Sequence, residues 1–120
     1  MLKMIKTKSL ITEYFNQYRS FEVEKYVDLG GFSGLKKVIR EGRDFPIKEL
    51  KAADLKGRGG AEFPAWRKWS SAKERNDETK LILCNADEGE PGSFKDRDLL
   101  LRDPYKVIEG MVIASYCIGA

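Results

Sequence analysis

Four consecutive residues, Gly57-Arg58-Gly59-Gly60, form the first segment whose composition suits ligand chemistry. Glycine tolerates positive φ and lets a ligand approach the backbone closely, and successive N–H groups beside an arginine attract an anion. The segment predicts a loop that holds a phosphate or a flat ring, with a plain surface turn and a solvated Arg58 as the alternative. A Rossmann fingerprint is not met, because Glu62 stands at its third glycine position.

A second candidate segment carries three carboxylates within four residues, Asp87, Glu88 and Glu90, shortly after Asn85. Carboxylates this close repel one another, so a folded chain holds them in water, near cations, or against hydroxyl donors such as ribose or ribityl groups. The apolar run at residues 80–85 predicts a strand directly before them. Ligands bind at the carboxyl ends of strands in open α/β sheets, so the acidic segment is either a binding loop or a solvated turn.

Lys68 lies among the aromatic residues Phe63, Trp66 and Trp69, close to the glycine loop. Aromatic rings in such a place either stack on a planar cofactor or pack as core and lid residues. The sequence leaves both interpretations open.

The cysteine and histidine content excludes several kinds of site. The chain has no histidine and only Cys84 and Cys117, which excludes Cys/His zinc sites, clusters held by four thiolates of this chain, and histidine-dependent triads. Both cysteines lie in apolar runs, which predicts reduced, buried thiols and a reducing compartment.

Composition indicates one foldable domain with a strongly solvated surface, since the 120 residues are 42% hydrophobic and 34% charged. The net charge of +3 gives no argument for nucleic acid. The apolar stretch at residues 111–120 is too short for the roughly 20 residues that cross a bilayer. The basic first twelve residues are followed by no apolar signal core, which argues against a secretory signal and leaves a mitochondrial transit peptide as an alternative.

The spacing of apolar residues, with capping residues and prolines, predicts five helices, at residues 9–18, 33–42, 46–55, 94–102 and 104–119. Residues 21–26 are either a strand or an extended linker. The strand at residues 80–85 cannot satisfy its own backbone hydrogen bonds, so a later segment, another chain or residues 21–26 must pair with it. The expected fold class is α/β, with a sheet that is incomplete in this chain.

Six runs occur in an order that resembles one family: Gly57-Arg58-Gly59-Gly60-Ala61, Phe63-Pro64, Lys68-Trp69-Ser70, Cys84-Asn85-Ala86-Asp87-Glu88-Gly89-Glu90-Pro91-Gly92, Phe94-Lys95-Asp96-Arg97 and Ile108-Glu109-Gly110-Met111. The family is the NADH-oxidising flavoprotein subunit of respiratory complex I, together with the diaphorase subunits of NAD-linked hydrogenases and formate dehydrogenases. The resemblance covers residues 30–120 and is strongest from Lys56 onward.

The resemblance implies a helical segment at residues 1–55, followed at residues 56–120 by the first part of a Rossmann-like domain that binds FMN and NAD(H). The positions that match flavin contacts are Gly57, Gly59, Lys68, Asn85, Asp87 and Glu88, and Arg58 and Gly60 complete the glycine loop. Phe63 and Glu90 match positions that contact NADH.

The same resemblance implies partners and a location. We expect NADH as the small-molecule partner, and either other subunits of an oxidoreductase complex or a second copy as the protein partner. We expect no nucleic acid and no direct membrane insertion. The chain is expected in the cytoplasm, or on the cytoplasmic side of a membrane as part of a complex.

The chain also departs from the family. Where the family has Gly-Phe-Pro-Thr-Gly, this chain has Glu62-Phe63-Pro64-Ala65-Trp66, and Ser71 stands where an aromatic residue is usual. Larger side chains fill space that glycine leaves open. At this length we expect only the N-terminal part of the family, without its later flavin-binding segment and its cluster cysteines. Two functions follow: a part of an NADH dehydrogenase subunit that passes electrons from NADH through FMN to iron–sulfur clusters, or a non-catalytic chain that associates with a partner.

Overall fold

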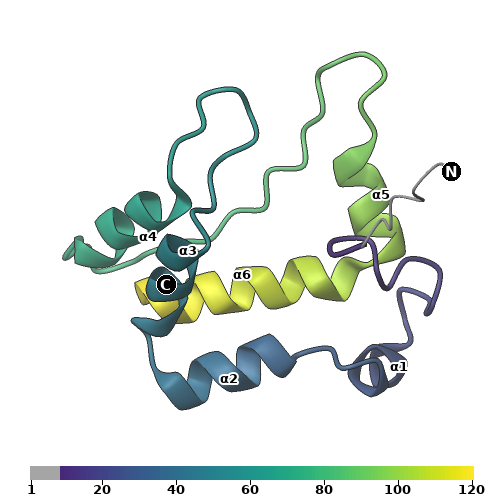
Figure 1. Ribbon diagram of the computed structural model, residues 1–120, viewed down its shortest axis with the longest axis horizontal. Helices are drawn as coiled ribbons and strands as arrows, with labels where there is room; N and C mark the ends of the chain where they lie inside the picture. The colour runs from purple at the N-terminus through teal and green to yellow at the C-terminus, as the bar shows by residue number, and fades with distance from the viewer. Residues whose placement is uncertain (1–8) are drawn as a thin grey trace, which may run out of the picture.

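The computed structural model describes residues 9–120. In chain order its helices are α1 (Val23–Asp28), α2 (Ser33–Glu41), α3 (Phe45–Ala52), α4 (Ala65–Glu74), α5 (Lys95–Arg102) and α6 (Pro104–Ile118). The long helix α6 is central and packs against α2, α3, α4 and α5 (Figure 1). Two long loops, before α4 and before α5, project from the same side of this helical layer (Figure 1).

The predicted helices at residues 33–42, 46–55, 94–102 and 104–119 are confirmed, and local end signals are clearest at α2 and α6. Pro104 lies in the first turn of α6, where its missing N–H costs nothing, and Gly119 ends the helix in the left-handed conformation. Gly42 ends α2 at a φ of 92° and donates its N–H to the carbonyl of Val38. None of the helices in the described part of the chain is long and apolar enough to cross a membrane.

The predictions for the segment before α2 are wrong. Residues 11–17 form successive turns rather than a helix, with hydrogen bonds from Phe15 to Thr12 and from Gln17 to Tyr14, and Asn16 interrupts the backbone at a φ of 62°. Residues 21–26, expected as a strand or linker, instead include the first four residues of α1, which begins at Val23. The basic first twelve residues, for which a transit peptide was the alternative, lie mostly outside the described part of the chain.

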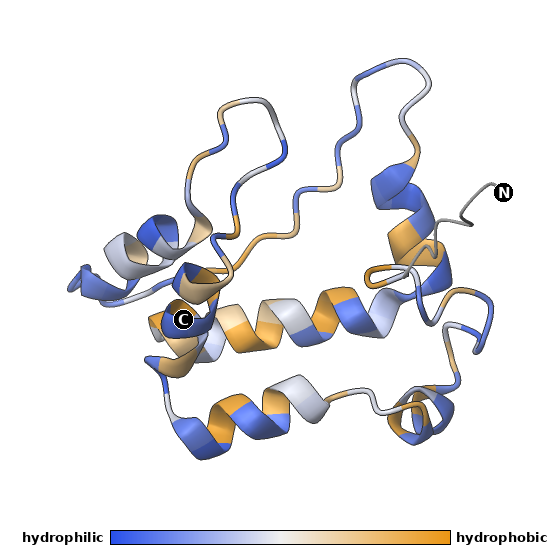
Figure 2. Ribbon diagram, in the orientation of Figure 1, coloured by the Kyte–Doolittle hydropathy of each residue, from blue (hydrophilic) through white to orange (hydrophobic). Residues whose placement is uncertain are grey.

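The strand predicted at residues 80–85 does not form. The segment is unpaired, and within residues 9–120 the only β contact is an isolated antiparallel bridge between Lys56 and Pro64. A strand needs a neighbour to receive its hydrogen bonds, and the described chain places none beside this segment. The hydropathy colouring of Figure 2 marks apolar residues along this extended segment before α5, and two of them are exposed to solvent, Leu81 by 75% and Leu83 by 85%. The described residues therefore form helices and loops, without the sheet expected of an α/β fold.

A cluster of tyrosines and carboxylates joins the segment before α2 to α6. Tyr26 is 1% exposed and Asp103 is fully buried. The hydroxyl of Tyr18 donates to Oδ1 of Asp103 at 2.5 Å, and the rings of Tyr18 and Tyr105 stack with centroids 5.6 Å apart. Oδ2 of Asp103 accepts no hydrogen bond, but Nζ of Lys106 lies 3.3 Å from it. Burial first, and then the bond to Asp103, raises the pKa of Tyr18 well above its usual range.

The two cysteines differ in their surroundings. Both are free, and Cys117 is buried at the end of α6, where burial raises the pKa of its thiol. Cys84 is exposed, which corrects the prediction of two buried thiols. The reason is the unpaired segment at residues 80–85, which has no neighbouring strand to cover its side chains.

Candidate functional site

The glycine loop is closed at its base by short backbone contacts. The N–H of Gly57 donates to the carbonyl of Phe63 at 2.9 Å, and the N–H of Ala65 donates to the carbonyl of Leu55 at 2.9 Å. Between these contacts the chain makes an open turn in which Gly60 has a φ of 101° and Glu62 a φ of 49°. The predicted loop is confirmed, and it leads directly into α4.

The backbone of this loop is accessible from outside. A Cβ placed on Gly59 would meet no atom within 4 Å, and the φ of Gly59 is not positive. Glycine at this position is therefore required neither by packing nor by backbone conformation, and the open side of the loop offers room for a ligand at close range.

A hollow of about 280 Å³ lies at the base of the loop. Its lining includes Gly57 and the cations Lys56 and Arg58, together with the carboxylates Asp54 and Glu62. Nζ of Lys56 is 3.0 Å from Oδ2 of Asp54, so these two charges are paired. Backbone N–H groups and the exposed Arg58 suit a phosphate in size and charge, whereas Glu62 opposes it.

Phe63 lies just before α4 and Lys68 lies in the first turn of α4, and both line one hollow. Nζ of Lys68 lies 5.7 Å from the centroid of the Phe63 ring, and Phe63 is 44% exposed. This hollow, of about 450 Å³, is also lined by Arg67, Ser71, Ala72 and Arg75. The structure therefore brings together one residue predicted to contact NADH and one predicted to contact FMN.

The two tryptophans lie elsewhere on α4. Trp66 is half-buried under Nζ of Lys51, 5.0 Å from the centre of its indole ring. Trp69 lines an apolar groove of about 390 Å³ with Val38, Pro46 and other residues of α2, α3 and α6. Their positions favour the packing interpretation over stacking on a cofactor at the Phe63 hollow.

Asn85, Asp87 and Glu90 occupy the second loop. Oδ1 of Asn85 accepts the N–H of Asp87 at 3.0 Å, a local turn that shapes the start of the acidic segment. Asn85 also lines a small hollow of about 100 Å³ with Cys84 and Leu99. The side chains of Asp87 and Glu90 are exposed.

Glu88 has a structural role in this loop. Its Oε1 accepts from Ser93 Oγ at 3.1 Å and from Lys95 Nζ at 3.3 Å, and its Oε2 accepts the N–H of Arg97 at 3.2 Å. Desolvation raises the pKa of Glu88, but the N–H groups of Asp96 and Arg97, with Lys95 and Ser93, outweigh it and hold the pKa at about 2. The carboxylate therefore ties the acidic loop to the start of α5.

The two candidate loops remain separate in the structure. Both project on the same side of α6 (Figure 1), and the hollows beside them are lined by different residues. Gly57 and Arg58 line one hollow, and Phe63 and Lys68 line another. The predicted residues of the acidic loop lie on the second loop, before α5: Asn85, Asp87, Glu88 and Glu90.

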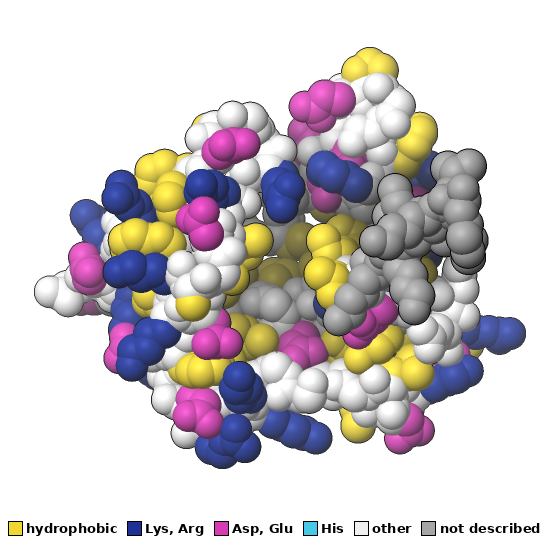
Figure 3. Space-filling model, in the orientation of Figure 1, with side chains coloured by type: hydrophobic (Ala, Val, Ile, Leu, Met, Phe, Trp, Pro, Cys, Tyr) yellow, Lys and Arg dark blue, Asp and Glu magenta, His cyan; other side chains and the backbone are white. Residues whose placement is uncertain are grey.

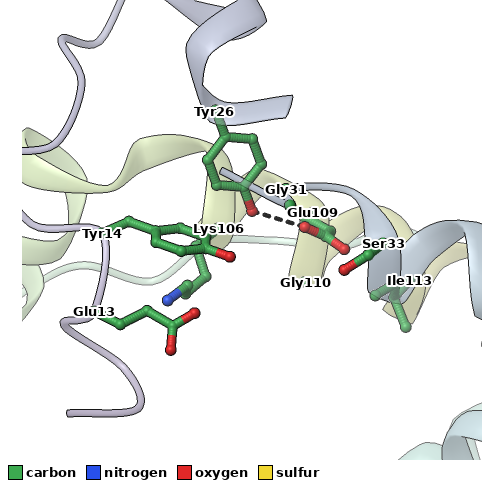
Figure 4. A pocket seen from close by; sticks show the side chains of 10 residues that line it. Glu13, Tyr14, Tyr26, Gly31, Ser33, Lys106, Glu109, Gly110 and Ile113 are labelled. Carbon is green, nitrogen blue, oxygen red and sulfur yellow. Dashed lines mark hydrogen bonds between the residues drawn. The ribbon is translucent and has the colours of Figure 1, made fainter. Parts of the chain in front are cut away.

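Sequence reasoning missed the role of Glu109. Its carboxylate accepts the hydroxyl of Tyr26 at 2.7 Å and the N–H groups of Phe32 and Leu35, each at 2.9 Å. Glu109 therefore caps α2 from α6, beside a hollow of about 340 Å³ (Figure 4). One signal pointed to such a partner, because the first turn of α2 has no acidic residue of its own.

Comparison with known proteins gives matches that include both candidate loops. The family described as Nuo51 FMN-binding domain matches residues 50–120. The chain is 49% identical over 92 residues to the F subunit (number 1) of the NADH-quinone oxidoreductase of Rhizobium meliloti (strain 1021), covering 76% of this chain and 21% of that protein. It is 39% identical over 114 residues to the F subunit of the NADH-quinone oxidoreductase of Aquifex aeolicus (strain VF5), covering 95% and 26%.

A third relative, the corresponding F subunit of Rickettsia massiliae (strain Mtu5), is 38% identical over 117 residues, covering 98% of this chain and 28% of that protein. The chain thus spans about a quarter of the length of these relatives. The matched range contains both candidate loops and confirms the resemblance found in the ordered motifs. This chain belongs to the Nuo51 FMN-binding domain family.

Proposed function

We propose that this chain supplies part of the FMN site of a protein that oxidises NADH. The observation that supports the proposal most is that the family match at residues 50–120 contains both loops predicted to bind the cofactor. The relatives are named as F subunits of NADH-quinone oxidoreductase, which supports NADH as the reductant. An FMN held there would supply the redox chemistry, which is acceptance of a hydride from NADH and, in the full-length family, one-electron transfer onward to iron–sulfur clusters.

The glycine loop is proposed to hold the phosphate end of the flavin. The N–H groups of Gly59 and Gly60 are hydrogen-bond donors beside Gly57, whose own N–H holds the base of the loop, and Arg58 adds the fixed fork of donors of its guanidinium. The open space beside Gly59 allows the approach that such contacts require.

The remaining predicted residues are proposed to orient the flavin and the dinucleotide. Lys68 supplies a positive charge, and the exposed oxygens of Asn85 and Asp87 accept hydroxyl groups of the flavin chain. Glu88 remains a proposed flavin contact, and its hydrogen bonds to α5 hold the acidic loop in place for that contact. Phe63 and Glu90 are proposed to contact NADH.

The proposal includes an arrangement that the described residues do not form by themselves. Residues 80–85 would become a strand of a Rossmann-like sheet once another segment pairs with them. We also propose a division between residues 1–55 and residues 56–120. The two parts are in contact, because α6 of the second part packs against α2 and α3 of the first. Two free cysteines suit a reducing compartment, so we place the chain in the cytoplasm or at the cytoplasmic side of a membrane complex.

A second candidate function is a non-catalytic chain that binds a protein partner. The observation in its favour is the unpaired apolar segment, with Leu81 75% and Leu83 85% exposed. Such a segment is a template for strand addition by another chain. Flavin binding separates the two candidates, because a partner-binding chain has no need of FMN.

Titration of FMN with this chain, followed by quenching of flavin fluorescence, tests the proposal. We expect a dissociation constant weaker than about 10 μM, because two separate exposed loops must be ordered on one ligand. Glu62→Gln should strengthen binding about fivefold, the factor given by roughly 1 kcal/mol of like-charge repulsion between groups about 4 Å apart that are screened by water. Glu24→Gln, an exposed change on α1, is the matched control. No binding at millimolar FMN would contradict the proposal and favour the second candidate.

A further inference from the structure

The hollow beside α4 has an unusual lining. It measures about 450 Å³, and its charged lining residues are all cations: Arg67, Lys68 and Arg75. Phe63 and Ser71 add a half-exposed ring and a hydroxyl. Lys and Arg side chains also gather over the α3–α4 end of the face in Figure 3. An aromatic ring, a hydroxyl and several cations around one hollow suit a ligand that has both a flat base and negative charge.

Helix spacing places three of these residues on one face. Arg67 and Ser71 lie in α4, and Arg75 is the residue directly after it. The three follow at intervals of four, so each lies about one turn from the next. The two arginine Cα atoms are about 12 Å apart along the axis at the usual helical rise. Two long guanidinium side chains can therefore converge from either side on a group held beside Ser71.

The cations near the start of α4 have no acidic residue beside them in the first turn of the helix. Arg67 and Lys68 occupy its N-terminal part, where the backbone dipole is positive, and the first turn contains no acidic residue. Arg75 has one carboxylate contact, from Nε to Oδ2 of Asp77 at 3.2 Å, but both side chains are well exposed. Exposed pairs of this kind are screened by solvent and leave the other guanidinium donors available.

We propose that Arg67 and Arg75 are the diphosphate ligands of this hollow, which takes a nucleoside diphosphate moiety with its base beside Phe63. The hydroxyl of Ser71 donates to the same phosphates, and Lys68 remains a proposed contact of FMN rather than of this ligand. The inference rests on the proposed function in one respect, since NADH contains an adenosine diphosphate half. It adds Arg67 and Arg75, residues that the sequence motifs do not single out, as phosphate ligands.

Calorimetric titration of the 120-residue chain with ADP tests this assignment without any flavin. Arg67→Gln and Arg75→Gln should each weaken ADP binding about fivefold or more, because each removes hydrogen bonds to a charged phosphate. Both positions are exposed at the helix surface, so the variants should fold, as circular dichroism can verify. Lys36→Gln removes the same charge from the exposed side of α2 and should leave ADP affinity within a factor of two.

Two further ligands separate the parts of the site. Pyrophosphate should bind more weakly than ADP but depend on the same two arginines, and adenosine should bind most weakly of the three. Equal weakening by Lys36→Gln, or unchanged ADP binding by both arginine variants, would overturn the proposal. Loss of FMN binding with ADP binding intact would count against the flavin site alone, and the reverse result would count against this inference alone.

Discussion

Replacement of Glu109 by alanine removes three hydrogen bonds that join α6 to α1 and to the start of α2. The carboxylate accepts the hydroxyl of Tyr26 at 2.7 Å and the N–H groups of Phe32 and Leu35 at 2.9 Å. The last two are donors at the start of α2 that have no acceptor within the helix, because α2 has no side-chain cap of its own. Glu109→Ala therefore deprives α2 of its cap and leaves the hydroxyl of the buried Tyr26 without its acceptor.

The size of the loss follows from these bonds. A helix cap contributes about 1 kcal/mol, and a hydrogen bond to a charged group about 1.5–3 kcal/mol. Tyr26 is 1% exposed, so its hydroxyl has little access to water as a replacement. We expect Glu109→Ala to lower the free energy of unfolding by about 3–4 kcal/mol, a large part of the stability of an ordinary domain.

Urea denaturation followed by circular dichroism measures this change. The matched control is Glu49→Ala on α3, whose side chain is exposed and lies 3.9 Å from Lys37, and which should cost less than about 0.5 kcal/mol. Tyr26→Phe removes only one of the three bonds and should cost about 1–2 kcal/mol, which keeps the test usable if Glu109→Ala does not fold. Stability of Glu109→Ala within about 0.5 kcal/mol of the parent would refute the capping role.

Three other outcomes are expected. The pKa of Glu88 is about 2 in the folded chain against 4.5 for the free side chain, so its contribution is present above pH 4.5 and lost as the pH falls toward 2. Unfolding by urea should therefore show a smaller stability difference between pH 7 and pH 3 in Glu88→Gln than in the parent, and an equal difference would contradict this. With a thiol reagent, Cys84 should react at once and Cys117 only after unfolding. Rapid reaction of both thiols in the folded chain would show that α6 does not protect Cys117. The parent should self-associate in light scattering and the double variant Leu81→Lys/Leu83→Lys should not, and a monomeric parent at high concentration would exclude pairing through this segment.

The sequence predicted those parts of the fold that depend on neighbouring residues. Asp103-Pro104 marks the start of α6, and Gly42 and Gly119 mark the ends of α2 and α6, because helix boundaries depend on local capping. The glycine loop at residues 56–64 is equally local, since its glycines permit the turn wherever the chain continues.

The features that the sequence did not predict correctly depend on contacts between residues far apart in the chain. The tyrosines at residues 9–18 have helical spacing, but they pack against α6 from a series of turns, so tertiary contacts override the local pattern. The strand at residues 80–85 needs a partner that the described chain does not place beside it. The role of Glu109 spans 74 to 83 residues of sequence, a distance over which no spacing rule applies.

The candidate site was predicted in its composition rather than in its arrangement. The residue types of the two loops indicate what each can bind, but they do not indicate that Glu88 is tied to α5 or that Phe63 and Lys68 share a hollow. Those relations arise from the way α4 and α5 begin, which depends on side-chain packing as well as on sequence spacing.

The most direct test of the central proposal is an NMR titration of the isotope-labelled 120-residue chain with FMN, in which backbone amides report contact with the ligand. The proposal predicts progressive shifts at residues 57–60, at Lys68 and at residues 85–88, with α2 unchanged as an internal control. Shifts in both loops at the same FMN concentration would mean that one flavin contacts both. Shifts confined to other parts of the chain, or to neither loop at millimolar FMN, would contradict the proposed site.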